Sequence, residues 1–484
     1  LLAYLLENGN LLRSSVYGVS AFSAPGIGGR LELFNWEGDL LWSYNYANQN
    51  YHQHHDFEYM PNGNVLLIAW EFKTGNDAEN LGRVNVGSEF WPLHIVELEP
   101  VGTDEANIVW EWHAWDHLIQ DVDPNKPNYG VVAEHPERIN INVATAGGTG
   151  YGNGDWMHCN SIDYNAELDQ ILVNSKKFKE FWIIDHSTTT QEAASSSGGN
   201  QGKGGDILYR WGNPQNYDRG TQSDLMHFGA HDVHWIEEGL PNAGKIIMFN
   251  NGQDRPEGNY SSVDIITPPL NTDGSYDMPE TMAFEPNVYY SSYFTDNTFY
   301  SAIMSSADVL PNGNMLITEG TEGRIFEINE NGNLVWEYIT PVGIFGVITQ
   351  EQLPLFNTIF RAYRYGQNYG AFDNKDLTTG DPVENNPIDY GCELYENLGL
   401  TAQNIKESAS IRGFPNPVKE QLFVTLPDNL ENLNEIVCVI DVYGNMVAKQ
   451  VINGTHMQFD TTDWPSGMYL LQMSQQNQFK FVKW

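Results

Sequence analysis

Histidine is concentrated in three short segments of the chain. Twelve of the thirteen histidines lie between His52 and His234, and the segments are residues 52–56, 156–160 and 226–234. An imidazole can act as a nucleophile, exchange protons near neutral pH, donate hydrogen bonds to an anion or bind a metal ion. A single histidine is more often a hydrogen-bonded structural residue, so it is the grouping that predicts a functional site.

The third segment opens a longer stretch, residues 226–252, in which we predict the catalytic centre. The stretch reads as two strands joined by a turn containing Gly, Pro and Asn. Because side chains along a strand alternate between faces, His227 and His231 can share one face while His234 points the other way. The second strand ends in an Asn-Asn-Gly corner that includes Asn251.

Metal binding is an alternative use of clustered histidines, and zinc takes three or four N, S or O ligands. The chain has neither an HExxH motif nor closely spaced cysteines, so we predict no metal site and no cofactor. Residues 121–125 (Asp-Val-Asp-Pro-Asn) resemble the start of a calcium loop. Their proline and the missing glycine favour an ordinary acidic turn.

The elements that must position the histidines are short strands separated by tight turns. A Pro-Asn-Gly-Asn turn precedes an apolar strand at residues 61–68 and again at 311–317, and strands ending in Trp recur near residues 42, 112, 211 and 336. Such hairpin units, repeated around a ring, are typical of a β-propeller with four-stranded blades. We therefore predict an all-β protein whose residues 1–370 form a six-bladed propeller. Equivalent strand ends meet at the centre of a propeller, which would bring the three histidine segments together.

Composition changes after the propeller. Residues 371–412 are polar and are predicted to be a linker, and residues 413–484 contain a second set of short strands typical of a small β-sandwich.

The strong negative charge excludes some partners. The chain contains 63 Asp and Glu and 24 Lys and Arg, which gives a formal net charge of -39. This charge would repel a polyanion, so we expect no nucleic-acid partner. No apolar run reaches 18 residues, so no transmembrane segment is predicted. Because the chain begins without Met, we expect a missing N-terminus with a signal peptide, and a secreted or cell-surface protein.

Five segments carry a family resemblance: residues 55–64, 158–164, 229–233, 249–252 and 310–317. Together, in order and spacing, they resemble the arylsulfotransferase family over nearly all of residues 1–370. The resemblance implies a six-bladed propeller, in agreement with the repeats. It also implies phosphoadenosine-independent transfer of a sulfuryl group from a phenolic sulfate ester to a phenol acceptor. The reaction would pass through a covalent sulfohistidine and show ping-pong kinetics.

Individual residues take roles from this resemblance. His231 corresponds to the nucleophilic histidine, and Ala230 stands where the family more often has Gln. His158 and Asn160 correspond to the family's His-x-Asn pair. His55 corresponds to a histidine of the first blades, with His54 as the alternate.

The remaining cationic position departs from the family. Lys176, eighteen residues after His158, stands where the family has arginine. Lysine keeps the charge but lacks the forked donors suited to a face of sulfate oxygens. We expect Lys176, His55 and His158 to complete the catalytic set with His231. The expected substrate-binding residues are Asn160, His54, His234, Asn251 and Ser305.

The C-terminal unit has its own motifs: Pro-Asn-Pro at 415–417, residues 440–444, residues 466–469 and Phe-Lys-Phe-Val-Lys at 479–483. It resembles the sorting domain of type IX secretion substrates in Bacteroidetes, with a carbohydrate-binding or adhesion sandwich as the alternative. The resemblance implies the type IX secretion machinery as a partner, and export through the periplasm.

Two alternative functions stay open. A non-catalytic propeller that binds a ligand at the cell surface is favoured if Lys176 cannot replace the arginine. A sulfatase-like relative would result if water intercepted the sulfohistidine.

Overall fold

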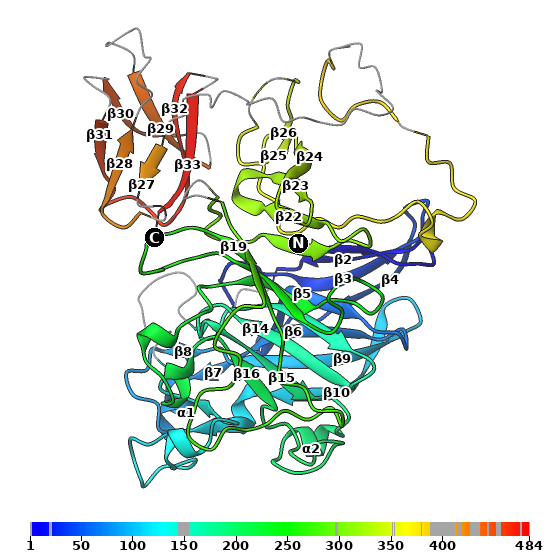
Figure 1. The fold of residues 1–484 in the computed structure, drawn as a ribbon, viewed down its shortest axis with the longest axis vertical. Helices are drawn as coiled ribbons and strands as arrows, with labels where there is room; N and C mark the ends of the chain where they lie inside the picture. Colours follow the sequence, from blue (N-terminus) through cyan, green and yellow to red (C-terminus); the bar gives the residue numbers. More distant parts are fainter. Residues whose placement is uncertain are drawn as a thin grey trace.

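The computed structural model is built almost entirely of strands (Figure 1). It describes residues 2–18, 22–143, 154–295, 299–350, 352, 354–378, 380–387, 412–414, 416, 418–425, 436–442, 445–451, 456–474 and 477–483. The α-helices among them are short, α1 (Gly75–Asn80) and α2 (Thr190–Ala193). The predicted all-β class is therefore confirmed.

Five four-stranded antiparallel sheets follow one another along the chain. The first contains β1 (Ala3–Leu5), β2 (Leu11–Val16), β3 (Gly29–Phe34) and β4 (Leu40–Asn45). The second contains β5 (Tyr51–Tyr59), β6 (Val65–Glu71), β9 (Leu93–Val101) and β10 (Glu105–His113). The third contains β13 (Cys159–Asn165), β14 (Gln170–Ser175), β15 (Glu180–Asp185) and β16 (Tyr209–Trp211). The fourth contains β17 (His231–Trp235), β18 (Ile246–Asn250), β19 (Ser262–Ile266) and β20 (Ser291–Tyr293). The fifth contains β21 (Ser306–Val309), β22 (Met315–Glu319), β23 (Arg324–Ile328) and β24 (Leu334–Ile339).

The Pro-Asn-Gly-Asn repeat forms the same turn in both copies. The Met60 N–H donates to the carbonyl of Asn64 (2.9 Å), and the Leu310 N–H donates to that of Asn314 (2.8 Å). Gly63 and Gly313 have φ values of 88° and 85°, a left-handed conformation that glycine adopts at little cost. The repeat read from the sequence is thus a structural unit that closes the first hairpin of a sheet.

Tryptophans on the outer strands of the first three sheets join each of these sheets to the next. The indole N–H groups of Trp42, Trp112 and Trp211 donate to carbonyl groups of the following sheet region. The acceptors are Glu105 (2.8 Å), Gly205 (2.7 Å) and Pro286 (2.7 Å). Apolar side chains fill the space between the same sheets; Ile68 and Ile95, for example, share a cluster with Val173. Burial of each large apolar side chain contributes roughly 1.5–3 kcal/mol. Sheets packed face to face around a centre make this region a β-propeller.

The expected count of six blades is not confirmed. Up to Ile339 the described residues form five four-stranded sheets. The segment 356–369 lies between the fifth sheet and the first. There the Ser305 N–H donates to the carbonyl of Phe360 (3.2 Å), and the Leu5 N–H donates to the hydroxyl of Tyr365 (3.1 Å). This segment closes the ring without forming a described strand.

Three two-stranded sheets complete the propeller region. They are β7 (Lys73–Thr74) with β8 (Glu89–Phe90), β11 (Leu118–Ile119) with β12 (Ile139–Asn140), and β25 (Val342–Gly343) with β26 (Gly346–Val347).

The C-terminal strands form two sheets around their own core and appear orange to red in Figure 1. One contains β27 (Arg412–Phe414), β28 (Gln421–Thr425) and β31 (His456–Asp460). The other contains β30 (Met446–Val451), β29 (Ile436–Asp441), β32 (Gly467–Ser474) and β33 (Asn477–Lys483). This arrangement agrees with the predicted small β-sandwich. Most of the expected linker, residues 388–411, lies outside the described residues.

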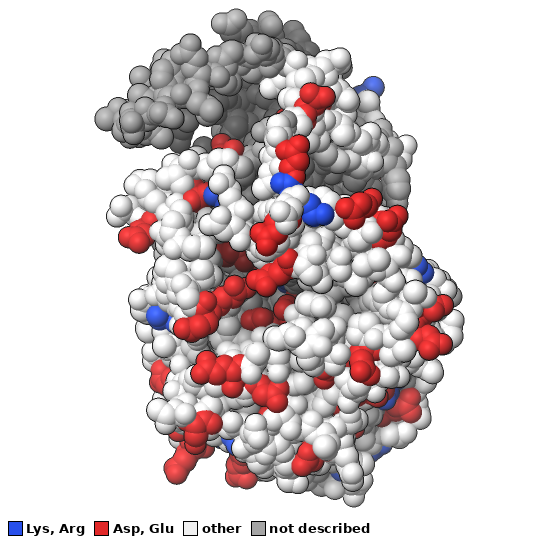
Figure 2. Space-filling model, turned by 90° about the vertical axis from the view of Figure 1, so that its right-hand side faces the viewer, with Lys and Arg blue, Asp and Glu red and all other residues white. Residues whose placement is uncertain are grey.

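The surface reflects the charge of the chain. Asp and Glu outnumber Lys and Arg over the face in Figure 2, and acidic side chains gather along a hollow near its middle. Among the described residues, no helix has the length and apolar character needed to cross a membrane.

Candidate active site

The first strand of each of four successive sheets contains, or directly follows, a residue in a left-handed conformation. These residues are His55 (φ 50°), His158 (φ 49°), Asp232 (φ 54°) and Ser305 (φ 88°). In β5, β13 and β17 the hydrogen-bond register shifts at the same place. A left-handed conformation costs a residue other than glycine about 1–2 kcal/mol, and such conformations often accompany functional sites. The bulges redirect the side chains at one end of these strands.

Buried or partly buried carboxylates hold these strands against one another. Each accepts a hydrogen bond from a backbone N–H of the next sheet's first strand. The three bonds, carboxylate first, are Asp56 to Ile162 (3.0 Å), Asp163 to Trp235 (2.7 Å) and Asp232 to Ala307 (3.1 Å). The repeated contact gives the strand starts, and the histidines on them, a fixed spacing.

Arg361 neutralises two of these carboxylates. Its Nη2 lies 2.6 Å from Asp56 Oδ2 and its Nε 2.8 Å from Asp232 Oδ1. The Arg361 side chain is only 4% exposed, and burial of such charges is favourable only when they are paired. The sequence analysis did not identify Arg361, because it stands alone in a segment without a motif.

The hydrogen bonds around His231 define its tautomer. The Asn251 amide nitrogen donates to the carbonyls of Ser301 (2.7 Å) and Met304 (3.0 Å), so its oxygen Oδ1 faces His231 Nδ1 at 2.7 Å. Nδ1 must therefore carry the proton and donate it. Nε2 is unprotonated, and its single lone pair accepts a hydrogen bond from the Met304 N–H (3.2 Å).

The surroundings of His231 keep the ring neutral. Burial lowers its pKa well below the usual value, and the positive charge of Lys176 lowers it further. His231 is 3% exposed. A neutral imidazole with an unprotonated Nε2 is the form that can attack an electrophile.

His55 and His158 form a second part of the site. Their ring centroids lie 4.7 Å apart at 76°. His158 Nδ1 lies 2.5 Å from Asp155 Oδ2, and Trp70 Nε1 donates to Asp155 Oδ1 at 3.0 Å. The carboxylate acceptor places the His158 proton on Nδ1, so Nε2 is the atom free to exchange a proton with a substrate. Burial lowers the pKa of His158, while Asp155 opposes that change.

His54 supports His55. Their Nδ1 atoms lie 2.8 Å apart, and the His54 ring stacks on Trp70 with centroids 4.1 Å apart. Burial lowers the pKa of His54 to about 3, so this ring is neutral. His54 therefore positions its neighbour through one ring nitrogen.

Lys176 supplies the positive charge of the site. It follows β14, and its N–H donates to the carbonyl of His158 (3.2 Å). Burial and the neighbouring charge of Lys177 lower the pKa of Lys176 to about 8. The ammonium group is therefore charged at neutral pH and titrates just above it.

Other predicted residues are engaged by the protein itself. Asn160 donates to the carbonyl of Ala230 (3.0 Å) and accepts from Asn174 (2.7 Å), which positions the residue before His231. Ser305 donates to Ser301 Oγ (2.8 Å) and accepts from the Gly320 N–H (3.0 Å). These contacts make both residues supports of the site.

His234 does not join the other histidines. It faces a cavity of about 860 Å³ that Asp232, Asp308 and Arg361 also line, whereas His231 does not line it. Its Nε2 lies 3.7 Å from Asp308 Oδ1. Asp232 and Asp308 raise the pKa of His234 against the effect of its burial. The structure thus separates His234 from His231, as predicted, although a register shift interrupts strand alternation between the two residues.

Sequence reasoning missed Asp155 as well as Arg361. Asp155 lies three residues before His158 in the sequence. No standard motif contains this spacing, so it did not identify Asp155 as a partner of the histidine.

The fold and the site together define a class of protein. It is a β-propeller in which neutral histidines gather where the first strands of its sheets meet. The family model "Arylsulfotransferase (ASST)" matches residues 7–341, and the chain belongs to that family. The model "Secretion system C-terminal sorting domain" matches residues 412–484. The expected resemblances are thereby confirmed, and the sorting domain marks the chain for secretion or attachment at the cell surface.

Solved structures with propeller-like folds resemble the chain only weakly. A protein of unknown function from Bacteroides caccae is 11% identical, with 70% of this chain and 81% of that chain covered and a TM-score of 0.35. Virginiamycin B lyase from Staphylococcus aureus is 10% identical, with 70% and 83% covered and a TM-score of 0.30. The beta-propeller domain of Cps50 (Swd1) from Myceliophteria thermophila is 10% identical, with 68% and 87% covered and a TM-score of 0.30. No curated protein matches the chain.

Proposed function

We propose that the chain is an aryl sulfate sulfotransferase that works without phosphoadenosine and transfers the sulfuryl group through His231. The observation that carries this proposal is the tautomer of His231. Asn251 accepts from Nδ1 at 2.7 Å, which places the lone pair on Nε2, and attack on sulfur would break the hydrogen bond that Nε2 accepts from the Met304 N–H. Membership of the arylsulfotransferase family supports sulfuryl transfer as the reaction class.

In the first half-reaction, His231 Nε2 attacks the sulfur of a phenolic sulfate ester. An N–S bond forms, the S–O bond to the phenol breaks, and the phenoxide leaves and takes a proton from solvent. Negative charge grows on the leaving oxygen and remains on the sulfuryl oxygens. The Lys176 ammonium and donors from His55 and its neighbours would stabilise that charge.

In the second half-reaction, a phenol acceptor attacks the sulfohistidine. An O–S bond forms, the N–S bond breaks, and the acceptor's proton passes to His158 Nε2 and then to solvent. Asp155 holds the Nδ1–H of His158 and would stabilise the transient imidazolium. Two sequential displacements at one histidine require ping-pong kinetics.

The same proposal assigns the division of the chain. Residues 1–370 would be the catalytic propeller, 371–412 a linker and 413–484 the type IX sorting domain.

The test is release of 4-nitrophenol from its sulfate ester, with and without phenol, by the wild type and by His231→Ala. We expect release that depends on phenol and is lost in the variant, and a sulfuryl group on His231 by mass spectrometry when phenol is omitted. His135→Ala is a matched control, because His135 is exposed and pairs only with Glu137 among the described residues. Release that ignores phenol would support a sulfatase, and no release would favour a binding propeller.

A further inference from the structure

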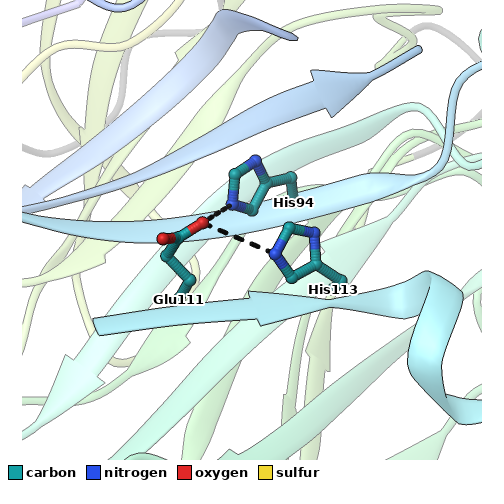
Figure 3. Close-up of side chains that lie close together, drawn as sticks. All are labelled: His94, Glu111 and His113. Carbon is teal, nitrogen blue, oxygen red and sulfur yellow. Dashed lines mark hydrogen bonds and ion pairs between the residues drawn. The ribbon is translucent and has the colours of Figure 1, made fainter. Parts of the chain in front are cut away.

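A second group of histidines lies on the outer strands of the second sheet. Figure 3 shows His94 on β9 and His113 on β10, with the carboxylate of Glu111 facing both rings from one side. The histidines of the candidate active site lie on the first strands of their sheets, whereas β9 and β10 are the third and outermost strands of this one. The group is therefore separate from the proposed catalytic site.

The strand register brings the three side chains together. His94 and His113 are direct cross-strand partners, and Glu111 lies two residues before His113 on the same face. Glu111 Oε2 lies 3.1 Å from His94 Nε2 and 3.5 Å from His113 Nε2. The candidate ligand atoms of the three residues lie within 4.8 Å of one another. Two imidazole nitrogens and one carboxylate oxygen thus lie around one small volume. The two rings stack with centroids 4.1 Å apart and planes 16° apart, so a shared ion would turn them until both nitrogens point at it.

The far nitrogen of each ring also has a partner. His113 Nδ1 lies 3.3 Å from Glu71 Oε2, and His94 Nδ1 lies 3.4 Å from the hydroxyl of Tyr46. Metal-binding histidines characteristically use their second ring nitrogen in this way, because the bond orients the ring and makes its ligand nitrogen more basic. A simple ion pair between Glu111 and one histidine would need neither outer partner.

We propose that His94, His113 and Glu111 bind a zinc ion through His94 Nε2, His113 Nε2 and a carboxylate oxygen. Two imidazoles with one carboxylate suit zinc and do not suit calcium or magnesium, which prefer oxygen ligands. Tetrahedral zinc would take water as its fourth ligand. The His94 side chain is 4% exposed while those of Glu111 and His113 are 30% and 25% exposed, so an ion can reach the group from solvent.

The ion would join two strands that are otherwise held together by backbone hydrogen bonds, packing and side-chain contacts such as those of Glu111 with His94 and of Asn107 with Glu99. Because zinc would bind the folded chain and not the unfolded one, it would stabilise the second sheet. Sulfuryl transfer, in contrast, would not depend on it.

The test is the zinc content of the full chain after removal of metal with EDTA, addition of excess Zn²⁺ and gel filtration. Wild type, Glu111→Gln, His113→Ala and the control His135→Ala are compared. We expect Glu111→Gln and His113→Ala each to retain one zinc ion per chain fewer than wild type and His135→Ala. Zinc should raise the melting temperature of wild type but raise that of the two variants less. Co²⁺ bound to wild type should show the visible absorption of a four-coordinate site that Glu111→Gln lacks.

Comparison between variants decides the result, because the active-site histidines could bind zinc as well. Equal zinc content in wild type and Glu111→Gln would overturn the proposal and identify the group as an ion-pair cluster. Glu111→Gln has the same shape as the native residue, so it decides the question if His113→Ala does not fold. Phenol-dependent release of 4-nitrophenol by Glu111→Gln should equal that of wild type, which separates this test from that of the proposed function.

Discussion

Asn251 controls the position of the His231 proton. Its amide oxygen accepts from Nδ1 at 2.7 Å, and its amide nitrogen is committed to the carbonyls of Ser301 and Met304. The amide therefore cannot rotate to offer a donor to His231 without losing two hydrogen bonds. In this way Asn251, which directly follows β18, determines which ring nitrogen of His231 on β17 carries the proton.

The first prediction concerns Asn251→Ala. Without the acceptor, the His231 proton can move to Nε2 and the ring can turn, so the rate of sulfohistidine formation should fall roughly 10²-fold or more. Stopped-flow release of 4-nitrophenol in the first turnover measures that step directly. Asn331→Ala, in an exposed turn, is the matched control and should leave the rate unchanged. An unchanged rate in Asn251→Ala would show that the tautomer is not important.

The second prediction concerns Lys176. Its pKa of about 8 means that the ammonium charge is lost as pH rises through that value. The first-turnover rate should therefore be high near neutral pH and fall above about pH 8. The first turnover is the step to measure because the acceptor phenol, which can itself ionise, takes no part in it. Lys176→Arg should remove the alkaline decline, because arginine keeps its charge. If wild type and Lys176→Arg decline together, another group is responsible.

The sequence predicted those parts of the site that local patterns encode. Residues close together in the sequence are enough to recognise three of these patterns: the Asn-Gly turns, the strands ending in Trp and the three histidine segments. The propeller pattern then implied that strand ends meet, and the structure does bring His55 and His158 to 4.7 Å between ring centroids.

Other features depend on contacts between distant parts of the chain, which local patterns do not contain. Arg361 meets Asp56 across 305 residues, and no motif surrounds it. The predicted count of six blades is not confirmed for a related reason: the contacts that close the ring after Ile339 come from residues 356–369, which form no described strand. The cross-strand pair His94 and His113 was also hidden, because residues paired across two strands have no fixed spacing in sequence.

The third prediction concerns Arg361→Met. The substitution leaves the Asp56 and Asp232 carboxylates, which are 0% and 3% exposed, without their positive partner. Removal of one partner of a buried ion pair costs about 3–5 kcal/mol. Urea unfolding followed by tryptophan fluorescence should show a loss of that size. Arg13→Met is the control, because its pair with Glu32 is nearly half exposed on the arginine side and should contribute about 0–1 kcal/mol. Similar losses in both variants would argue against a structural role for the central arginine.

The last prediction concerns pH and Asp308. Burial and the nearby Asp232 raise the pKa of Asp308 to about 7, and one of its oxygens, Oδ2, is buried without a hydrogen-bond partner. A folded-state pKa above the unfolded value means that the folded chain holds the proton more tightly. Stability from this group is therefore present at low pH and is lost as pH rises from about 4 to about 7. Asp308→Asn keeps the neutral shape at every pH, so it should be more stable than wild type at pH 8 by about 1 kcal/mol or more and nearly equal to it at pH 4. Asp104→Asn removes one exposed charge and should show no such pH dependence. A difference between wild type and Asp308→Asn that is the same at both pH values would show that folding does not raise the pKa of Asp308.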